Sequence, residues 1–503
     1  MKQFWGIVKI ISSITLITVL AVSFSGCSRK SSTSTKQSSA TAKITIWRAA
    51  DNEESFQELI KSYQQDHPNV TFEYRYNPEW EKNPDLYLEE TINALATGKG
   101  PDIWSVRNDW MPAQYQKVRP APDGTVGVYS NDTKIKSQTN VEATKSLFVP
   151  VVTDDVSLGG QVYGLPLSVD SLALYTNQTI LDQVSDELSS SNRLSKQLLP
   201  EELTSIKKIL ANGPKDWNEL VKIAPYITTK KGDSISRSAV AMGLGNNIES
   251  APDIISTLLL QNNTQIITDD LKSAFFQNAQ SSASGTETYP GQGAIKFYTN
   301  FGIKNNPWYS WNNTDFSSGA RQAFMDGKVA MIFEDSTFYA TLKASNIKFN
   351  FNIITMPQID RDNPTSYANY WVETVTNNSK VSDVAWDFLS YATTTNNVTS
   401  YLSNTKRPPA LISKTTDYDE SANQLAVFNG QSKIARSWYK GGYPSTTDEI
   451  FRNWADSIAV GGKNVTEATN TAAGELTTLL QASSTLPTSS STSTTTQTQS
   501  LSK

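Results

Sequence analysis

Residues 43–104 contain five segments in which the spacing of hydrophobic residues alternates between that of a strand and that of a helix. Apolar and polar residues alternate at 43–47 and again at 70–74, which predicts two strands. Apolar residues three and four positions apart at 56–63 and 88–95 predict helices. Residues 101–104 lead into a third strand. Strands and helices in this order predict a parallel sheet covered by helices.

The same alternation returns in the second half of the chain. Asp216 and Glu219 are spaced as a capping box, in which both side chains accept hydrogen bonds from the backbone of the first helical turn. Trp217 lies on the apolar face that follows, and we assign it to the core. Hydrophobic spacing also predicts a helix at 316–325 closed by Gly327, a strand at 329–333 and a helix at 381–389.

The N-terminus has the layout of a secretory signal peptide, assigned to 1–26. Two lysines lie before or at the start of an apolar stretch at 10–24, and small residues then lead to Cys27. Residues 24–27 resemble a bacterial lipobox, although Phe24 stands where Leu is more usual. Lipidation of Cys27 would anchor the protein on the extracytoplasmic face of the cell membrane. The alternative is a plain signal peptide followed by an incidental cysteine.

Two tracts poor in apolar residues flank the folded part of the chain. Residues 27–42 are rich in Ser, Thr and Lys, and predict a flexible tether between the membrane and the fold. Residues 483–503 are rich in Ser, Thr and Gln, and predict a disordered tail. The folded part is therefore expected at 43–482.

Composition excludes several classes of function. Among 503 residues, 44 are basic and 49 acidic, so the chain lacks the positive field of a nucleic-acid binder. Cys27 and His67 are the only cysteine and histidine, which removes zinc clusters, Cys-His pairs and Ser-His-Asp triads. His67 is expected in an ordinary surface turn. Carboxylate-only chemistry, as in glycosidases, is not removed by this argument.

Six short motifs occur in an order that resembles the family of extracellular solute-binding proteins that includes maltose-binding protein. The motifs lie at 44–47, 98–103, 163–177, 217–220, 324–333 and 385–389. The resemblance implies a two-lobed α/β periplasmic-binding-protein fold, type II-like, with mostly parallel sheets, hinge crossovers and ligand in the cleft. It places lobe one at 43–168 plus 356–405 and lobe two at 169–355 plus 406–482. The segment 185–212 resembles an insertion.

Candidate ligand residues follow the first and third strands, on loops where this family builds its cleft. A sugar needs carboxylates and amides for its hydroxyls and aromatic planes for its ring faces. Trp47, Arg48 and Asp51 supply such groups after the first strand, although Asp51 could instead cap the next helix. The resemblance makes Asp109 a binding carboxylate, with Trp110 beside it. The alternative is a solvated loop carboxylate next to a packing aromatic.

The second set of candidates belongs to the crossovers and lobe two. The resemblance implies that Asp170 is another binding acid. Glu334 and Asp335 come at the carboxyl end of the strand at 329–333, the edge where open α/β sheets bind ligands, and many relatives carry Gly and Trp there. A stacking role would then pass to Phe338 or Trp371, or the ligand would carry amines or a metal ion. Tyr443 is a further aromatic near an expected cleft loop, and core packing is the alternative for Trp371 and Tyr443.

The leading interpretation is a lipoprotein, not an enzyme, that captures an oligosaccharide or sugar derivative and delivers it to an ABC permease. We expect a monomer with no cofactor and no metal ion. One alternative is a membrane-anchored carbohydrate-active enzyme that uses paired carboxylates such as Glu334 and Asp170. Another is an importer subunit for a polyamine, a peptide or a metal-loaded ligand, although the scarcity of His and Cys argues against a soft metal.

Overall fold

The structure is a computed structural model, and it describes residues 41–190, 198–281, 285–415 and 424–484. The predicted signal peptide, Cys27 and nearly all of the predicted tether and tail lie outside these residues. Within the described part, no helix is both long enough and apolar enough to cross a membrane.

The first sheet has the strand order β2-β1-β3-β15-β4. The strands are β1 (Ala42–Arg48), β2 (Val70–Tyr76), β3 (Ile103–Arg107), β4 (Val118–Arg119) and β15 (Trp371–Thr376). Strand β1 is parallel to β2 and β3, which confirms the parallel arrangement predicted from the first five segments. Strand β15 is antiparallel to β3 and β4, because it enters from the second lobe and does not follow a β-α-β connection.

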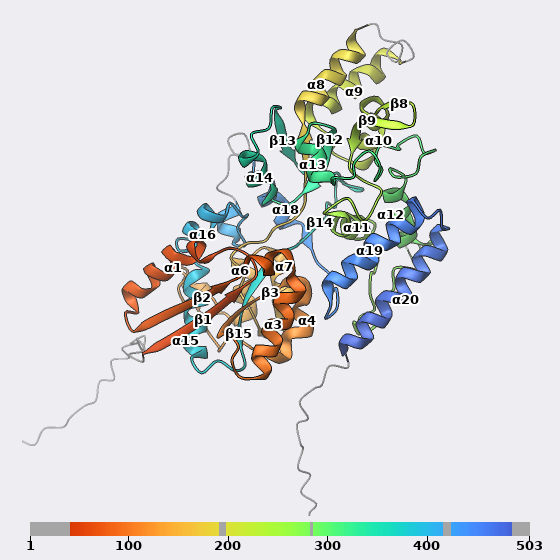
Figure 1. Cartoon of the computed structure of the whole chain (residues 1–503). Coiled ribbons are helices and arrows are strands. Elements are labelled where there is room, and N and C mark those ends of the chain that lie inside the picture. The colour runs from red at the N-terminus through yellow and green to blue at the C-terminus, as the bar shows by residue number, and fades with distance from the viewer. Residues whose placement is uncertain (1–40, 191–197, 282–284, 416–423, 485–503) are drawn as a thin grey trace, which may run out of the picture. The chain divides into compact units, whose positions relative to one another are not determined.

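Helices surround this first sheet (Figure 1). Helix α1 begins at Asn52 as its N-cap, so Asp51 is not the cap that the sequence left open. The helices and helical turns are α1 (Glu53–Asp66), α2 (Pro78–Lys82), α3 (Pro84–Ala96), η1 (Asn108–Trp110), α4 (Met111–Gln114), η2 (Tyr115–Lys117), α5 (Thr133–Lys136), α6 (Asn140–Leu147), α7 (Pro150–Val156), α15 (Ser382–Ala392), α16 (Val398–Thr405) and α17 (Ile412–Thr415).

The second sheet has the order β13-β7-β12-β9-β8. Its strands are β7 (Ala173–Asn177), β8 (Thr229–Lys231), β9 (Ser234–Val240), β12 (Val329–Glu334) and β13 (Phe351–Ile354). Only β12 and β9 are parallel, and the other three pairs are antiparallel. The expected α/β class is confirmed, but the sheets are mixed and not mostly parallel. The strand β7 runs against its neighbours because it arrives directly from the first lobe.

Helices also flank the second sheet, and α8 and α9 lie side by side in Figure 1. They are α8 (Gln178–Ser189), α9 (Pro200–Asn212), α10 (Trp217–Ile227), α11 (Ala251–Gln261), α12 (Pro290–Thr299), α13 (Ala320–Met325), α14 (Phe338–Ala344), α18 (Ala426–Lys433), α19 (Pro444–Ala459) and α20 (Val465–Ser484). The small strand pairs are β5 (Ser157–Leu158) with β6 (Gln161–Val162), β10 (Gln280–Ser281) with β11 (Glu287–Thr288), and β14 (Ser366–Tyr367) with β16 (Ala435–Arg436).

Two separate hydrophobic cores define the two lobes. The core of lobe one contains buried residues of 42–169 and 368–411, with Ala435. The core of lobe two contains buried residues of 172–367 and 428–480. The chain therefore passes between the cores near residue 170, between Tyr367 and Ala368, and after Leu411.

Several local predictions have definite outcomes. Trp217 is buried in the core of lobe two, as predicted, and its indole donates to Gln261 Oε1 at 2.7 Å. Asp216 accepts from Glu219 N at 2.8 Å, but the Glu219 carboxylate accepts from Lys215 N, so the reciprocal half of the capping box is wrong. The helix predicted at 316–325 begins only at Ala320, because Gly319 has a φ of 88° and interrupts it.

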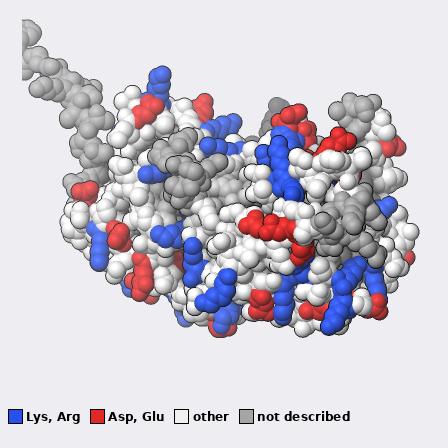
Figure 2. Space-filling model, turned by 90° about the horizontal axis from the view of Figure 1, so that it is seen from above, with Lys and Arg blue, Asp and Glu red and all other residues white. Residues whose placement is uncertain are grey.

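Charges of both signs are interspersed on the face of the molecule shown in Figure 2. Neither sign forms a continuous field over that face, in keeping with a formal net charge of -5. This surface lacks the basic stripe with which a protein collects nucleic acid.

Candidate ligand site

Asp109 lies in a buried network of charged residues contributed by both lobes, which we call the Lys440 network. Lys440 Nζ donates to Asp448 Oδ1 at 2.7 Å and Asp253 Oδ1 at 3.3 Å, and lies 3.6 Å from Asp109 Oδ2. Tyr367 donates its hydroxyl to Asp109 Oδ2 at 3.2 Å. Arg107 completes the network, with its Nη2 3.5 Å from Asp109 Oδ2.

The charges in the Lys440 network depend on one another. Burial by itself would lower the pKa of Lys440, but the surrounding carboxylates, Asp448 foremost, raise it well above its usual range. Burial would likewise raise the pKa of Asp253, but Lys440 and Arg107 hold it below its ordinary value. Lys440 therefore stays charged although only 1% of its side chain is exposed. Removing it would leave three carboxylates facing one guanidinium.

Two polar atoms in this network have no hydrogen-bond partner among the described residues: Arg107 Nε, a donor, and Asp109 Oδ1, an acceptor. Buried polar groups are nearly always paired, so an unpaired donor and acceptor on neighbouring side chains can receive a ligand. Trp371 adds a partly buried aromatic ring whose centroid is 5.9 Å from the Arg107 guanidinium. A carboxylate, a guanidinium and an aromatic ring are thus brought together here.

The second network, the Arg407 network, joins the loop after β1 to the end of α16. Arg48 forms ion pairs with Glu373 and with Asp51 Oδ2, the latter at 2.9 Å. Its Nε donates to the Ala50 carbonyl at 3.2 Å, and Tyr401 donates to Asp51 Oδ2 at 2.8 Å. Arg407 Nε donates to Asp51 Oδ1 at 3.0 Å.

These contacts determine the roles of Arg48 and Asp51, two of the candidate residues at the end of the first strand. Arg48 is 1% exposed and each of its nitrogens has a partner, so it holds the loop in place and offers little to a ligand. Asp51 adopts a left-handed conformation with a φ of 64°, which directs its carboxylate to both arginines. Burial opposes ionisation of Asp51, yet Arg407 and Arg48 lower its pKa.

Asp170 lies at the first crossover and binds the loop that follows β12. Its carboxylate accepts from Ser336 Oγ and, at 2.9 Å, from its neighbour Ser171 N. Burial, followed by the charge of Asp335, raises the pKa of Asp170 to about 7. The backbone carbonyl of Asp170 also accepts from Asn369 N at 3.0 Å, and the Asn369 side chain donates to Asp253 Oδ2 at 3.0 Å. Asn369 thereby links Asp170 to the Lys440 network.

Three further candidates come from the end of β12 and from the loop and helix that follow it. Glu334 is buried and accepts from Arg321 Nε at 2.9 Å and Nη2 at 2.7 Å, while burial raises its pKa to about 7. Phe338 is 1% exposed and packs against Tyr175 in the core of lobe two, so it cannot supply a stacking face in this conformation. Asp335 caps its own loop by accepting from Thr337 N at 2.9 Å.

Three aromatic candidates have different environments. Trp47 is partly buried, with its ring 4.2 Å from the guanidinium of Arg75. Trp110 is buried and meets the edge of Trp371 at 5.5 Å, so it supports the Trp371 ring. Tyr443 is 44% exposed at the start of α19. The sequence alone did not distinguish these roles.

The most connected residues of both networks were missed from the sequence. Lys440 lies in the segment 438–444, where only the aromatic residues were considered, and its two following glycines were the available signal of an unusual loop. Arg407 precedes two prolines. They indicate a crossover between the lobes, but they do not indicate which residues form ion pairs with Arg407. No local sequence pattern marks Asp253, Tyr367 and Asp448, because their part in the network depends on contacts between distant segments.

No cluster of three or more metal-ligating side chains suited to a metal ion occurs among the described residues. The three carboxylates nearest each other in the Lys440 network already surround an ammonium group. His67 stacks on Tyr63 with ring centroids 4.0 Å apart and lies 3.5 Å from Asp387, at the end of α1.

Comparison with known proteins defines the class. The model of the bacterial extracellular solute-binding protein family matches residues 58–413, and the chain belongs to this family. It is a solute-binding protein with the two-lobed periplasmic-binding-protein fold. No protein with a curated function matched the chain.

Solved structures share the fold at low sequence identity. The cyclic alpha-maltosyl-1,6-maltose binding protein of Arthrobacter globiformis has a TM-score of 0.65 and 18% identity, with 88% of this chain and 99% of that chain covered. The sugar-binding protein MalE of Xanthomonas citri has a TM-score of 0.65 and 16% identity, covering 88% and 98%. A solute-binding protein of Thermotoga lettingae bound to alpha-D-tagatose has a TM-score of 0.59 and 19% identity, covering 87% and 100%.

Proposed function

We propose that this protein captures a carbohydrate, an oligosaccharide or sugar derivative, for delivery to an ABC permease. The observation that carries the proposal is the unpaired donor and acceptor of Arg107 and Asp109 beside the Trp371 ring. A sugar hydroxyl donates and accepts at once, and its ring face packs on an aromatic plane, so the three groups match one sugar residue. Structurally similar proteins that bind maltodextrins and tagatose support the same ligand class.

The contacts of Glu334 and Asp170 argue against the alternative that the protein is an enzyme. Of its two carboxylates, Glu334 is engaged on both oxygens by Arg321, and Asp170 is engaged by Ser336 and Ser171. A general acid or nucleophile needs a carboxyl oxygen directed at the substrate. Incubating the protein with the glycans that bind it, and measuring released reducing ends, tests this alternative directly. Turnover would overturn the classification as a binding protein.

The ligand class is tested by a thermal-shift screen of residues 28–503 against maltotetraose, monosaccharides and spermidine. A ligand that binds only the folded state raises the melting temperature. A shift with a sugar supports the proposal, whereas a shift with spermidine alone would assign the three carboxylates around Lys440 to an amine ligand. Maltotetraose is a suitable first probe because a structurally similar cyclo/maltodextrin-binding protein forms a complex with it.

The role of Asp109 is tested by calorimetric titration with the sugar that the screen identifies. Asp109→Ala is expected to lower affinity fivefold to more than a hundredfold, because a lost hydrogen bond to a charged group costs about 1–3 kcal/mol. Asp123→Ala is the matched control, since Asp123 is an exposed carboxylate of lobe one. Equal affinities for the two variants would remove Asp109 from the site.

We further propose that Cys27 carries a lipid that holds the protein on the extracytoplasmic face of the cell membrane. The support is the lipobox-like sequence at 24–27 and membership of an extracellular family. Cys27→Ala should move the protein from the membrane fraction to the soluble fraction while sugar binding is retained. Equal membrane retention of the variant and the wild type would show that the cysteine is incidental.

A further inference from the structure

Two atoms of the Lys440 network have no hydrogen-bond partner in the described part of the chain, and they place different requirements on a ligand. Asp109 Oδ1 belongs to a carboxylate and can only accept a hydrogen bond, whereas Arg107 Nε can only donate one. A ligand carboxylate has no hydrogen to donate to Asp109, and a ligand ammonium has no lone pair for Arg107. A hydroxyl group donates and accepts, so it satisfies both atoms. The hydrogen bonds by themselves therefore favour an uncharged sugar unit.

The charges of the Lys440 network distinguish between the two kinds of charged ligand. Three carboxylates face only two cations, so negative charge is in excess by one. The carboxylates belong to Asp109, Asp253 and Asp448, and the cations to Lys440 and Arg107. Lys440 and Asp109 are each 1% exposed, and buried charges are screened by salt much less than surface charges are. A ligand carboxylate would add a fourth anion to this network, whereas a ligand ammonium would offset the excess.

The charges beside the Lys440 network do not supply the missing cation. In the Arg407 network two arginines are paired with two carboxylates, so that network is balanced by itself. Asp155 and Asp170, which lie beside the Lys440 network, are carboxyl groups as well and add no positive charge. The negative excess therefore remains around the two atoms that we assign to the ligand.

We propose that the cleft accepts neutral and amino sugars and rejects acidic sugars such as uronic acids. Since Arg107 and Asp109 are taken to bind one sugar unit, this selection rests on the proposed function. Asp448, on α19, determines the selection without binding the sugar. Its Oδ1 accepts from Lys440 Nζ at 2.7 Å, and its charge accounts for the negative excess.

The test uses residues 28–503 and three forms of one probe, methyl maltotetraoside. One form is unmodified, and in the other two an aminomethyl group or a carboxylate replaces the C6 hydroxymethyl group of every glucose unit. Length and linkage thus stay constant while the charge changes. In calorimetric titrations at pH 7.5, the wild type should bind the neutral and amine forms at least about tenfold more tightly than the carboxylate form. A lower pH is avoided because burial raises the pKa of Asp448.

Asp448→Asn tests whether the Lys440 network causes this selection. The variant keeps an oxygen for Lys440 and removes one negative charge, so two carboxylates face two cations. Its affinity should rise at least about threefold for the carboxylate form, fall at least about threefold for the amine form and stay within about twofold for the neutral form. Opposite shifts for two probes separate an effect of charge from a loss of folding, because a loss of folding would weaken the binding of all three.

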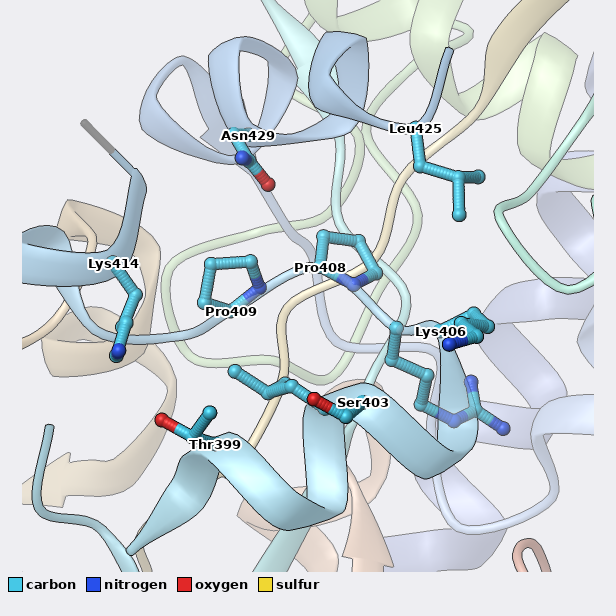
Figure 3. Close-up of a pocket in the computed structure, with 10 residues that line it drawn as sticks. Thr399, Ser403, Lys406, Pro408, Pro409, Lys414, Leu425 and Asn429 are labelled. Carbon is cyan, nitrogen blue, oxygen red and sulfur yellow. The ribbon is translucent and has the colours of Figure 1, made fainter. Parts of the chain in front are cut away.

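Two control variants change the charge outside the Lys440 network. Glu449→Gln removes an exposed carboxylate from the position next to Asp448 on α19. Lys414→Gln removes a cation that lines a separate pocket of about 350 Å³ between α16 and α18, beside the third crossover (Figure 3). None of the described residues that line this pocket belongs to the Lys440 network. Both variants should bind the three probes as the wild type does.

The outcomes separate this selection from the proposed function. A carboxylate form that binds the wild type as tightly as the amine form does, or shifts of the same sign for both charged forms in Asp448→Asn, would overturn the selection by charge and leave the proposed function standing. Absence of binding by all three forms would instead count against the carbohydrate function and would remove the basis of the selection.

Discussion

The Arg407 and Lys440 networks are built from the same kinds of side chain but differ in how completely they are paired. In the Arg407 network every nitrogen of Arg48 has a protein partner, and Glu373 also accepts from Ser105 Oγ at 2.6 Å. In the Lys440 network three carboxylates surround one ammonium, and Arg107 Nε and Asp109 Oδ1 have no hydrogen-bond partner among the residues that the structure describes.

This difference separates a structural role from a binding role. A buried side chain with a partner on every nitrogen, such as Arg48, fixes the backbone around it, here the left-handed turn at Asp51 next to β1. A partly paired network has remaining capacity for hydrogen bonds, which a ligand can use. Residue type alone would have given both networks the same role.

The largest expected effect on stability concerns the Arg407 network, to which we assign a structural role. Arg48→Met should lower the free energy of unfolding by about 3–5 kcal/mol, because it leaves the buried Glu373 carboxylate without its partner. Guanidinium chloride unfolding measures the loss. Arg436→Met, at an exposed arginine, should stay within about 0.5 kcal/mol of wild type. A change below about 1 kcal/mol in Arg48→Met would mean that this network does not hold the loop.

A smaller loss, about 3 kcal/mol at pH 7.5, is expected for Lys440→Met, because Arg107 remains and the carboxyl groups can take up protons. Without the ammonium, burial and mutual repulsion raise the pKa values of Asp253 and Asp448 in the folded state. The folded variant then binds more protons than the unfolded chain, so its stability rises as the pH falls. The deficit relative to wild type should shrink at pH 5.5. A loss of stability that does not change with pH would contradict the inference that carboxylates outnumber positive charges in the variant's network.

Asp155 extends the comparison to a carboxyl group that has only neutral donors, namely Ser437, Tyr370 and Asn108. Burial raises its pKa to about 7. A raised pKa means that the folded state keeps a proton that the unfolded chain releases near pH 4, so stability falls as the pH rises from about 4 to 7. Asp155→Asn should flatten the fall in melting temperature between pH 5 and 7.5. An unchanged slope would show that Asp155 is ionised in the folded state.

The smallest effect on stability is expected for deletion of the two terminal tracts. Deleting 28–40 and 486–503 should leave the melting temperature almost unchanged, since these tracts have almost no apolar residues to bury. A fall of several degrees would show that one of the tracts docks on the folded part. Melting curves of the two single deletions would then identify which one.

The sequence by itself determined the elements and the class of fold. Alternating and helical spacing located β1, α1, β2, α3 and β12, because burial of one face imposes a period on the sequence. The order of short motifs indicated the family, which the match of the family model over residues 58–413 confirms. Trp217 was assigned correctly to the core, since a large aromatic on an apolar helical face has few other places to go.

Tertiary structure alone decided which candidate side chains have partners. Arg48 and Arg107 are both arginines at a strand end, yet within the described part of the chain Arg48 has a partner on every nitrogen and Arg107 Nε has none. Glu373, the partner of Arg48, is 325 positions away in the chain, and Lys440, which lies against Asp109 beside Arg107, comes from an equally distant segment. Charge pairing depends on distances of a few ångströms between such segments, and no local pattern of residues encodes those distances.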